Sequence, residues 1–177
     1  MIKVITPTID SELEQQILSN NKHKLTIFLA GTIDNGDSEN WQDKLIWHMK
    51  NYHQSVNYDS DESIGDIIVF NPRRENWNSN ATIEEHQQQI KWEQDHLDNA
   101  DLIIMYLADN SKSPISLLEL GLYGPDGKMI VFCTPNFYRY TNVKMTCDKY
   151  NIPIVTSLNI DEICSQISEI YEEIKEY

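Results

Sequence analysis

The chain is poor in cysteine and has no long apolar run. Its 177 residues include only three cysteines, Cys133, Cys147 and Cys164. They are widely spaced and form no CxxC pair, so neither a disulfide framework nor a zinc site is indicated. No apolar stretch reaches the length of a membrane span, and the first residues lack a basic region followed by an apolar core. We therefore expect a cytoplasmic protein with reduced thiols.

Basic residues are also scarce. Lys and Arg number 14 against 28 Asp and Glu, which gives a net charge of −14. Such a charge opposes binding to the phosphate backbone of a nucleic-acid polymer or to an anionic membrane. Neither partner is therefore expected. One small anion held by backbone amides remains compatible, because that binding is local.

Short apolar runs alternate with amphipathic stretches along the whole sequence. The runs typical of buried strands are residues 25–30, 66–71, 102–107, 128–134 and 152–156. This alternation predicts an α/β fold with a doubly wound, mostly parallel five-stranded sheet, flavodoxin-like in class. The length suits one domain over residues 1–177. Within it we expect an accessory strand and helix at 1–24 and a covering helix at 158–177.

The stretch from Ala100 to Gly121 is the most informative part of the chain. Its apolar run, 102–107, is typical of a strand buried on both faces, and a polar loop follows it. Pro114 then suits the first turn of a helix. A strand that leads into a helix is where open α/β sheets bind ligands, so functional residues are expected here.

One carboxylate stands inside that apolar helix. Glu119 lies four residues after Ile115 and three before Leu122, so we expect it on their face, pointing toward the core. Lys112 and Lys128 are too far along the chain to meet it across one helical turn. Glu119 is then either a functional carboxylate in a pocket or a side chain that reaches the helix edge or a distant arginine.

A second carboxylate has a similar position on the preceding helix. The expected apolar stripe there is Ile83, Ile90 and Leu97. Glu93 is three residues after Ile90 and four before Leu97, so it too is expected on the inward stripe. Two core-facing carboxylates on helices that flank one strand are harder to explain structurally than one.

Two other strand ends carry residues that suit a ligand pocket. Gly31 and Thr32 follow the strand at 25–30, where a glycine allows a ligand to approach closely, although a tight turn needs it equally. Arg73 and Trp77 follow the strand at 66–71, and they suit a flat polar ligand through hydrogen bonds and stacking. A surface loop with an Arg/Glu pair is the alternative.

Metal-binding patterns are weak. Asp59 and Asp61 resemble a DxD pair, but they lie in a serine-rich loop that no apolar strand precedes. His86 and His96 are ten residues apart on one helix, so they lack the one-turn spacing of a metal pair and are assigned to the surface. No metal and no cofactor are expected.

Five short segments are informative together. They are FLAGTI, FNPRR, QIKWEQDHLDNAD, SPISLLELG and FYRYTNV. In this order and spacing they resemble the nucleoside 2-deoxyribosyltransferase-like family, over about residues 2–153. The family and its relatives cleave the N-glycosidic bond of 2'-deoxynucleosides or their monophosphates, and the transferases pass the sugar to another base.

The resemblance implies roles for the two carboxylates. Glu119 falls on the family's nucleophile, which attacks the anomeric carbon and forms a covalent deoxyribosyl-enzyme. Glu93 falls on the acid/base carboxyl group that protonates the leaving base, where the family's transferases carry the shorter aspartate. The chemistry would follow that of retaining glycosidases. Burial and mutual repulsion would keep one group protonated while the other stays ionised.

Substrate contacts are implied as well. Gly31 and Thr32 match the glycine loop beside the sugar, while Arg73 and Trp77 border the base. Ser113 matches the position that recognises the 5' oxygen, where nucleoside transferases commonly carry a carboxylate and monophosphate hydrolases a hydroxyl. A carboxylate would repel a phosphate and Ser113 would not, so a 5'-monophosphate substrate is an open alternative.

Finally, the resemblance implies a homo-oligomer in which the loop Phe137–Asn142 lies near a neighbouring subunit's site, with Asn142 and Arg139 acting there. Three hypotheses follow: a deoxyribosyltransferase, a hydrolase of 2'-deoxynucleoside 5'-monophosphates, and a non-catalytic nucleotide-binding or sensing module. The presence of both carboxylates favours the two enzymes. The expected partners are a small deoxynucleoside or deoxynucleotide and a free nucleobase.

Overall fold

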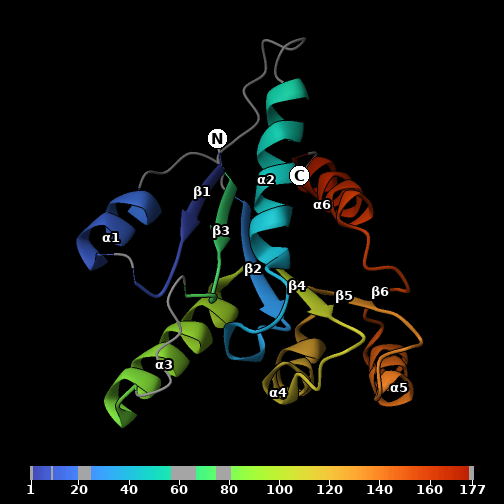
Figure 1. Cartoon of the computed structure of the whole chain (residues 1–177). Coiled ribbons are helices and arrows are strands. Elements are labelled where there is room, and N and C mark those ends of the chain that lie inside the picture. Colours follow the sequence, from blue (N-terminus) through green and yellow to red (C-terminus); the bar gives the residue numbers. More distant parts are fainter. Residues whose placement is uncertain (1, 9, 20–24, 57–66, 75–80, 176–177) are drawn as a thin grey trace.

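The sheet is parallel throughout and has six strands. The computed structural model describes residues 2–8, 10–19, 25–56, 67–74 and 81–175. The strands are β1 (Ile2–Ile5), β2 (Leu25–Gly31), β3 (Ile67–Phe70), β4 (Leu102–Leu107), β5 (Met129–Cys133) and β6 (Ile154–Val155). Their order is β1-β3-β2-β4-β5-β6, and every neighbouring pair is parallel (Figure 1).

This order confirms the predicted doubly wound, flavodoxin-like class. From β3 to β6 the strands follow the order 2-1-3-4-5, with β1 added beyond β3 at the edge. The expected strand number of five is wrong by one. The strand expected within residues 1–24 is present, and β1 pairs with β3 in register from Ile2 opposite Ile67 to Ile5 opposite Phe70.

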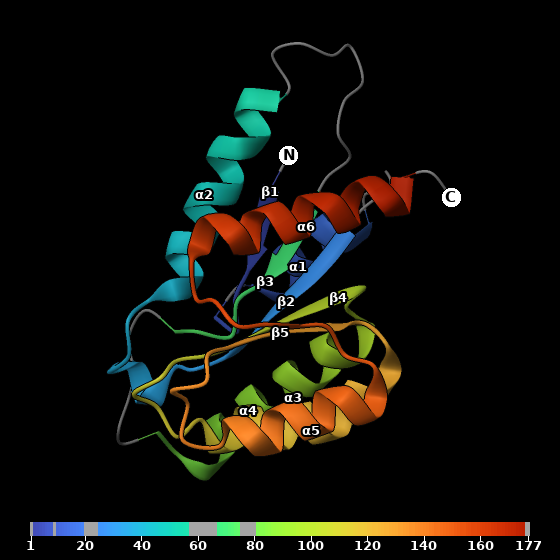
Figure 2. The ribbon, with the colours of Figure 1, turned by 90° about the vertical axis from the view of Figure 1, so that its right-hand side faces the viewer.

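Helices cover both faces of the sheet. They are α1 (Ser11–Ser19), α2 (Trp41–Val56), α3 (Ile83–Asn99), α4 (Pro114–Tyr123), α5 (Tyr140–Tyr150) and α6 (Ile160–Lys175), with short 3-10 turns at η1 (Asp34–Gly36) and η2 (Gly124–Asp126). α2 and α6 lie on one face, and α3, α4 and α5 lie on the other (Figure 2). In the described part of the chain, no helix has the length and apolar character needed to cross a membrane.

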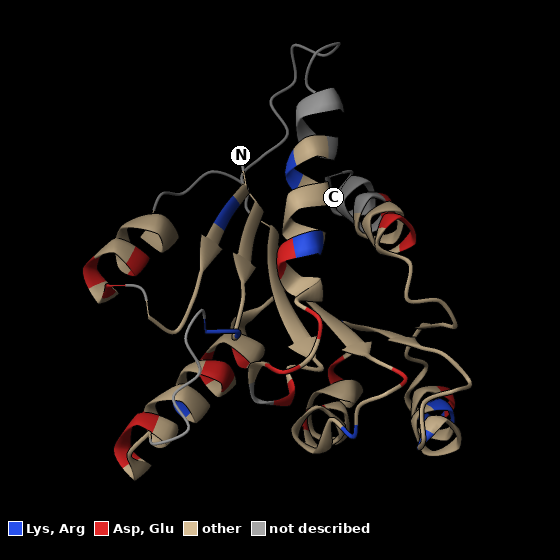
Figure 3. Ribbon diagram, in the orientation of Figure 1, with Lys and Arg blue, Asp and Glu red and all other residues tan. Residues whose placement is uncertain are grey.

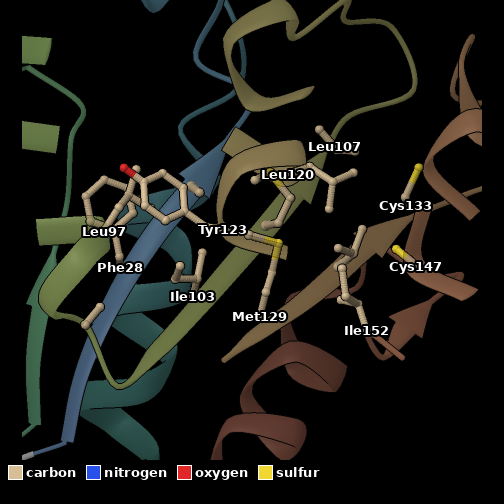
Figure 4. Packing of buried hydrophobic residues seen from close by; sticks show 14 of the residues in the cluster. Phe28, Leu97, Ile103, Leu107, Leu120, Tyr123, Met129, Cys133, Cys147 and Ile152 are labelled. Carbon is tan, nitrogen blue, oxygen red and sulfur yellow. The ribbon is translucent and has the colours of Figure 1, made fainter. Parts of the chain in front are cut away.

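β4 is the centre of two hydrophobic cores. All six of its residues are buried, as its continuous apolar run predicts. Ile103 and Met105 pack toward α3, α4 and α5 with residues such as Phe28 (Figure 4). The alternate residues, such as Ile104, pack on the other face with Trp41 of α2. Both faces of the sheet are thus covered, which leaves the ends of its strands as the place for a ligand.

The three cysteines are buried in these cores. Burial raises the pKa of Cys133 to about 12 and the pKa values of Cys147 and Cys164 to about 11. Because the thiolate is the reactive form, these thiols are unreactive packing groups at neutral pH.

The chain diverges after the carboxyl ends of β2 and β4, which pair up to Gly31 opposite Tyr106. The chain continues from β2 to α2 on one face and from β4 to α4 on the other face (Figure 2). In open α/β sheets, this is the point where ligands bind. Gly31 pairs with Tyr106 here at φ 129°, and a Cβ atom at Gly31 would lie 2.1 Å from the Tyr106 carbonyl oxygen. Only glycine fits between these two strands.

Gly31→Ala should therefore destabilise the fold by about 2 kcal/mol or more, because the backbone of two paired strands would have to move. Gly121→Ala is the matched control, since a Cβ atom at Gly121 meets nothing within 4 Å. In the helix interior this control should be neutral or slightly stabilising. Urea unfolding followed by circular dichroism measures both, and equal effects of the two variants would contradict the argument.

Candidate active site

Glu119 points toward the interior on a different helix face from the expected one. Ile115 and Leu122, its predicted core-facing neighbours, are 60% and 56% exposed, so that part of the prediction is wrong. The buried face of α4 carries Ser116 and Tyr123, three residues before and four after Glu119. The misassignment has a physical cause: a helix that is apolar nearly all round does not reveal which side meets solvent.

The stripe predicted for α3 is also mostly wrong. Ile83 is 73% exposed and Ile90 is 50% exposed, whereas Leu97 is buried. The N-terminal half of α3 extends beyond the sheet, so its isoleucines have no strand to pack against (Figure 1). Glu93 lies nearer the sheet, one turn from Gln89 and one turn from Leu97, and is partly buried.

His96 is buried on α3 rather than exposed as predicted. One ring nitrogen lies 2.7 Å from the Trp92 carbonyl oxygen, and the other lies 2.8 Å from a Glu14 carboxylate oxygen. The His96 ring also packs 4.3 Å from the Phe70 ring. His96 therefore links α3 to α1 through a hydrogen bond to Glu14.

The two helices bring their carboxyl groups within electrostatic reach. Desolvation by burial, together with the charge of Glu93 as the smaller cause, raises the pKa of Glu119 to about 8. Among the described residues, none gives Glu119 a hydrogen bond or an ion pair. A carboxyl group without a partner in a water-poor wall is a functional candidate, because structural carboxylates are normally satisfied.

Glu93 has a more polar setting. Burial raises its pKa, while a hydrogen bond from Gln89 and the charge of Arg74 act in the opposite direction. The Gln89 side-chain amide donates to Glu93 at 2.7 Å and to the Pro72 carbonyl at 3.0 Å, and its oxygen accepts from Arg74 at 2.5 Å. These contacts fix the amide so that it donates one N–H to Glu93 and the other to Pro72. The raised pKa of about 8 favours the protonated form of Glu119 at neutral pH, whereas Gln89 and Arg74 favour the ionised form of Glu93.

Thr32 and Ser113 meet where β2 and β4 end. Their hydroxyl oxygens are 2.7 Å apart and both residues are buried. Thr32 is fixed from three sides, since its N–H donates to Tyr106, its hydroxyl accepts from the Ala108 N–H, and its carbonyl accepts from Trp41. The structure thus joins two predicted substrate contacts that are far apart in sequence.

Arg73 braces the loop that follows β2. Its guanidinium donates to the carbonyl oxygens of Gly36 at 2.9 Å and Ser38 at 2.7 Å. The neighbouring Arg74, rather than Arg73, is the arginine connected to a candidate catalytic carboxyl group. Trp77 lies outside the described residues, as do Asp59 and Asp61.

Asn142 lies on the other side of α4 from Glu119. Together with Arg139 it lines an open cleft of about 310 Å³ between α4 and α5, where Leu117 and Gly121 form the α4 wall. Leu117 and Gly121 are each two residues from Glu119, about half a turn around the helix. Within one chain, the structure therefore does not bring Asn142 to the two carboxyl groups.

Sequence reasoning missed several residues of this region. Gln89 is four residues before Glu93, a spacing that could have indicated a contact on one helix face. Ser111, Ser113 and Asp34 form a connected group, but the Ser111–Asp34 bond joins residues 77 apart and has no local signal.

The functional groups of this site are thus carboxyl and hydroxyl groups. Among the described residues, no group of three or more His, Cys, Asp or Glu side chains could hold a metal ion. Two coupled carboxyl groups suit nucleophilic attack combined with proton transfer.

The family described as "Nucleoside 2-deoxyribosyltransferase like" matches residues 24–137, well over half of the chain. The protein therefore belongs to this family. Comparison with curated proteins gave no match. Membership indicates an enzyme of the glycosyl-transfer or hydrolysis type that acts on nucleosides or nucleobases, consistent with the two carboxyl groups at the sheet edge.

The raised pKa of Glu119 makes stability depend on pH. Between the ordinary carboxyl value of 4.5 and about 8, the folded state binds a proton that the unfolded state releases, so stability falls as the pH rises. Glu119→Gln removes the titrating group. It should raise the free energy of unfolding at pH 8 by roughly 1 to 3 kcal/mol, discounted for partial solvent contact, and by less at pH 5.

Urea unfolding at the two pH values measures the difference. Glu84→Gln is the matched control, because Glu84 is an exposed carboxylate on α3. It should change stability little at either pH. An equal gain from Glu119→Gln at pH 5 and pH 8 would show that its carboxyl group titrates normally.

Proposed function

We propose that the protein is a nucleoside 2'-deoxyribosyltransferase. The observation that carries this proposal is the coupled pair of Glu119 and Glu93, at the carboxyl edge of the sheet and partly shielded from water. The pKa values of both groups are raised, that of Glu119 to about 8, so the pair is suited to hold a proton at neutral pH. Cleavage of an N-glycosidic bond needs one ionised carboxylate and one acid, so this state suits the reaction.

In the first step, the Glu119 carboxylate forms a bond to the anomeric carbon, and the bond between that carbon and the base nitrogen breaks. The electron pair of the broken bond stays on the base, which takes a proton from Glu93. Because the raised pKa of about 8 favours protonated Glu119 at neutral pH, its proton must pass to Glu93 before Glu119 can attack. The positive charge that develops on the sugar favours the ionised form of Glu119.

In the second step, a nitrogen of the incoming base attacks the anomeric carbon, and the bond to Glu119 breaks. Glu93 accepts the proton of that nitrogen, and the original state returns. Water in place of the base gives hydrolysis by the same route. A hydrolase of 2'-deoxynucleoside 5'-monophosphates is therefore the alternative function, and both functions retain the configuration at the anomeric carbon.

Glu119→Ala should abolish exchange and Glu93→Ala should lower it by about 10²–10⁴-fold, the range of general acid–base catalysis. The assay is chromatography of deoxynucleosides and their 5'-monophosphates, each with and without a free acceptor base. Glu84→Ala on α3 is the matched control and should keep wild-type rates. Mass spectrometry should find a deoxyribosyl group on Glu119 when no acceptor is present.

Product analysis separates the hypotheses. A new deoxynucleoside that forms only with acceptor supports the transferase. Free base that accumulates without acceptor, and only from monophosphates, would establish the hydrolase instead. Ligands that bind yet remain uncleaved over hours would support a nucleotide-binding or sensing module. An active Glu119→Ala protein would contradict the assignment of Glu119 as the nucleophile.

We further propose that a second copy of the chain covers α3 and α4. Five apolar side chains on these adjacent helices are at least half exposed: Ile83, Ile90, Ile115, Leu118 and Leu122. An exposed apolar surface of this kind is typical of an interface. A neighbouring copy here would also bring residues from outside the chain to the carboxyl groups, which Asn142 of the same chain does not approach.

Leu118→Glu should shift the protein to a smaller species in size-exclusion chromatography with light scattering and should lower the activity. It introduces like charges that would face each other across the interface. Trp47→Glu on α2 is the matched control, since Trp47 is 62% exposed on the opposite face of the sheet. The same mass for both variants and the wild type would contradict this interface.

A further inference from the structure

A chain of buried hydroxyl groups connects the candidate sugar site to one carboxylate. Thr32 and Ser113 have hydroxyl oxygens 2.7 Å apart, and those of Ser113 and Ser111 are 2.8 Å apart. The Ser111 hydroxyl then donates to a carboxylate oxygen of Asp34 at 2.8 Å. All three hydroxyl residues are at most 5% exposed, so the chain is shielded from exchange with water.

The carboxylate fixes the direction of every bond in this chain. An ionised carboxylate only accepts, and a hydroxyl has a single proton to donate. Ser111 gives its proton to Asp34, so it must accept from Ser113. The Ser113 proton is thereby used, and Thr32 must donate to Ser113. The direction therefore runs from Thr32 through Ser113 and Ser111 to Asp34.

This direction leaves Ser113 as an acceptor. Its hydroxyl oxygen accepts from Thr32, donates to Ser111 and keeps one free lone pair. The hydroxyl is not used to cap α4, although Ser113 is the N-cap residue. A ligand that meets Ser113 must therefore supply the proton of the hydrogen bond. A hydroxyl group can do so, whereas the oxygens of a phosphate dianion only accept.

The charge around the hydroxyl chain also disfavours a bound phosphate. Asp34 and Asp37 lie in the loop after β2, and Asp109 lies in the loop after β4, and the ribbon of these loops carries acidic residues (Figure 3). Lys112 is the nearest cation in sequence, beside Ser113, and it is exposed. The Arg73 guanidinium also lies on the loop after β2, so the carboxylate that acts on a phosphate at Ser113 is that of Asp34, which is bonded to the hydroxyl chain.

We propose that Asp34, acting through Ser111, orients Ser113 so that the site accepts the free 5'-hydroxyl of a deoxynucleoside and rejects its 5'-monophosphate. This inference rests on the proposed function and on the family resemblance, which implies that Ser113 recognises the 5' oxygen of the substrate. Asp34 is a positioning residue, since it touches Ser111 and not the substrate. Ser113 is held as a hydrogen-bond acceptor. It can therefore accept from the 5'-hydroxyl, as the carboxylate at this position of the family's nucleoside transferases would.

The backbone of Asp34 permits a clean test. Its φ of 49° is a left-handed conformation that glycine adopts without strain. Asp34→Gly removes the carboxylate, frees the Ser111 proton and lets the chain reverse, so that Ser113 can donate. Asp34→Asn keeps an oxygen that accepts from Ser111. Asp37→Asn removes the same charge from the same loop and makes no change in the hydroxyl chain.

The readout is the ratio of kcat/KM for a deoxynucleoside to kcat/KM for its 5'-monophosphate. The wild type should favour the nucleoside by about tenfold or more, the effect of one hydrogen bond. Asp34→Gly should reduce this ratio by about tenfold, mainly through a gain on the monophosphate. Asp34→Asn should largely restore the ratio, and Asp37→Asn should leave it near the wild-type value.

Equal losses on both substrates in Asp34→Gly would reduce Asp34 to a structural role, and a wild-type preference for the monophosphate would overturn the inference. Calorimetric titration of the Glu119→Ala protein with the deoxynucleoside and with its 5'-monophosphate tests this inference separately from the proposed function. A binding preference for the nucleoside without any wild-type cleavage would remove the function and keep the inference. Cleavage of both ligands without preference would keep the function and remove the inference.

Discussion

The close contact of β2 and β4 at Gly31 is the constraint on which the site depends. A side chain at this position would overlap the Tyr106 carbonyl, so the two strands can pair to their ends only with glycine. That pairing holds Thr32 beside the end of β4. It also places α2 and α4 on opposite faces, which opens the crevice where an α/β sheet binds ligands.

The second constraint is the shared electrostatics of Glu119 and Glu93. Two carboxyl groups near each other in a poorly solvated wall cannot both ionise at neutral pH, and the pair retains one proton. Gln89 and Arg74 favour the ionised form of Glu93. In the proposed reaction a proton passes between the two carboxyl groups, so that reaction depends on their electrostatic coupling.

Hydroxyl groups acquire a defined role from their surroundings. Ser113 in isolation is equally a donor and an acceptor, and sequence comparison makes it a candidate phosphate contact. In the folded protein it is the middle of a hydrogen-bonded chain that ends on Asp34, and its single proton is already used. The chemical character of the side chain is therefore set by a residue from another loop.

The sequence by itself determined the fold class and the buried strand at 102–107, and it marked Glu119 and Glu93 as candidate functional residues, because apolar runs and carboxylates in apolar helices are local signals. It could not determine which face of α4 meets solvent, since that helix is apolar nearly all round. Tertiary structure alone decided that Arg74 and not Arg73 acts near Glu93. It also decided the contacts of Asp34 and Thr32 with the serines, because strand pairing joins segments that no local pattern connects.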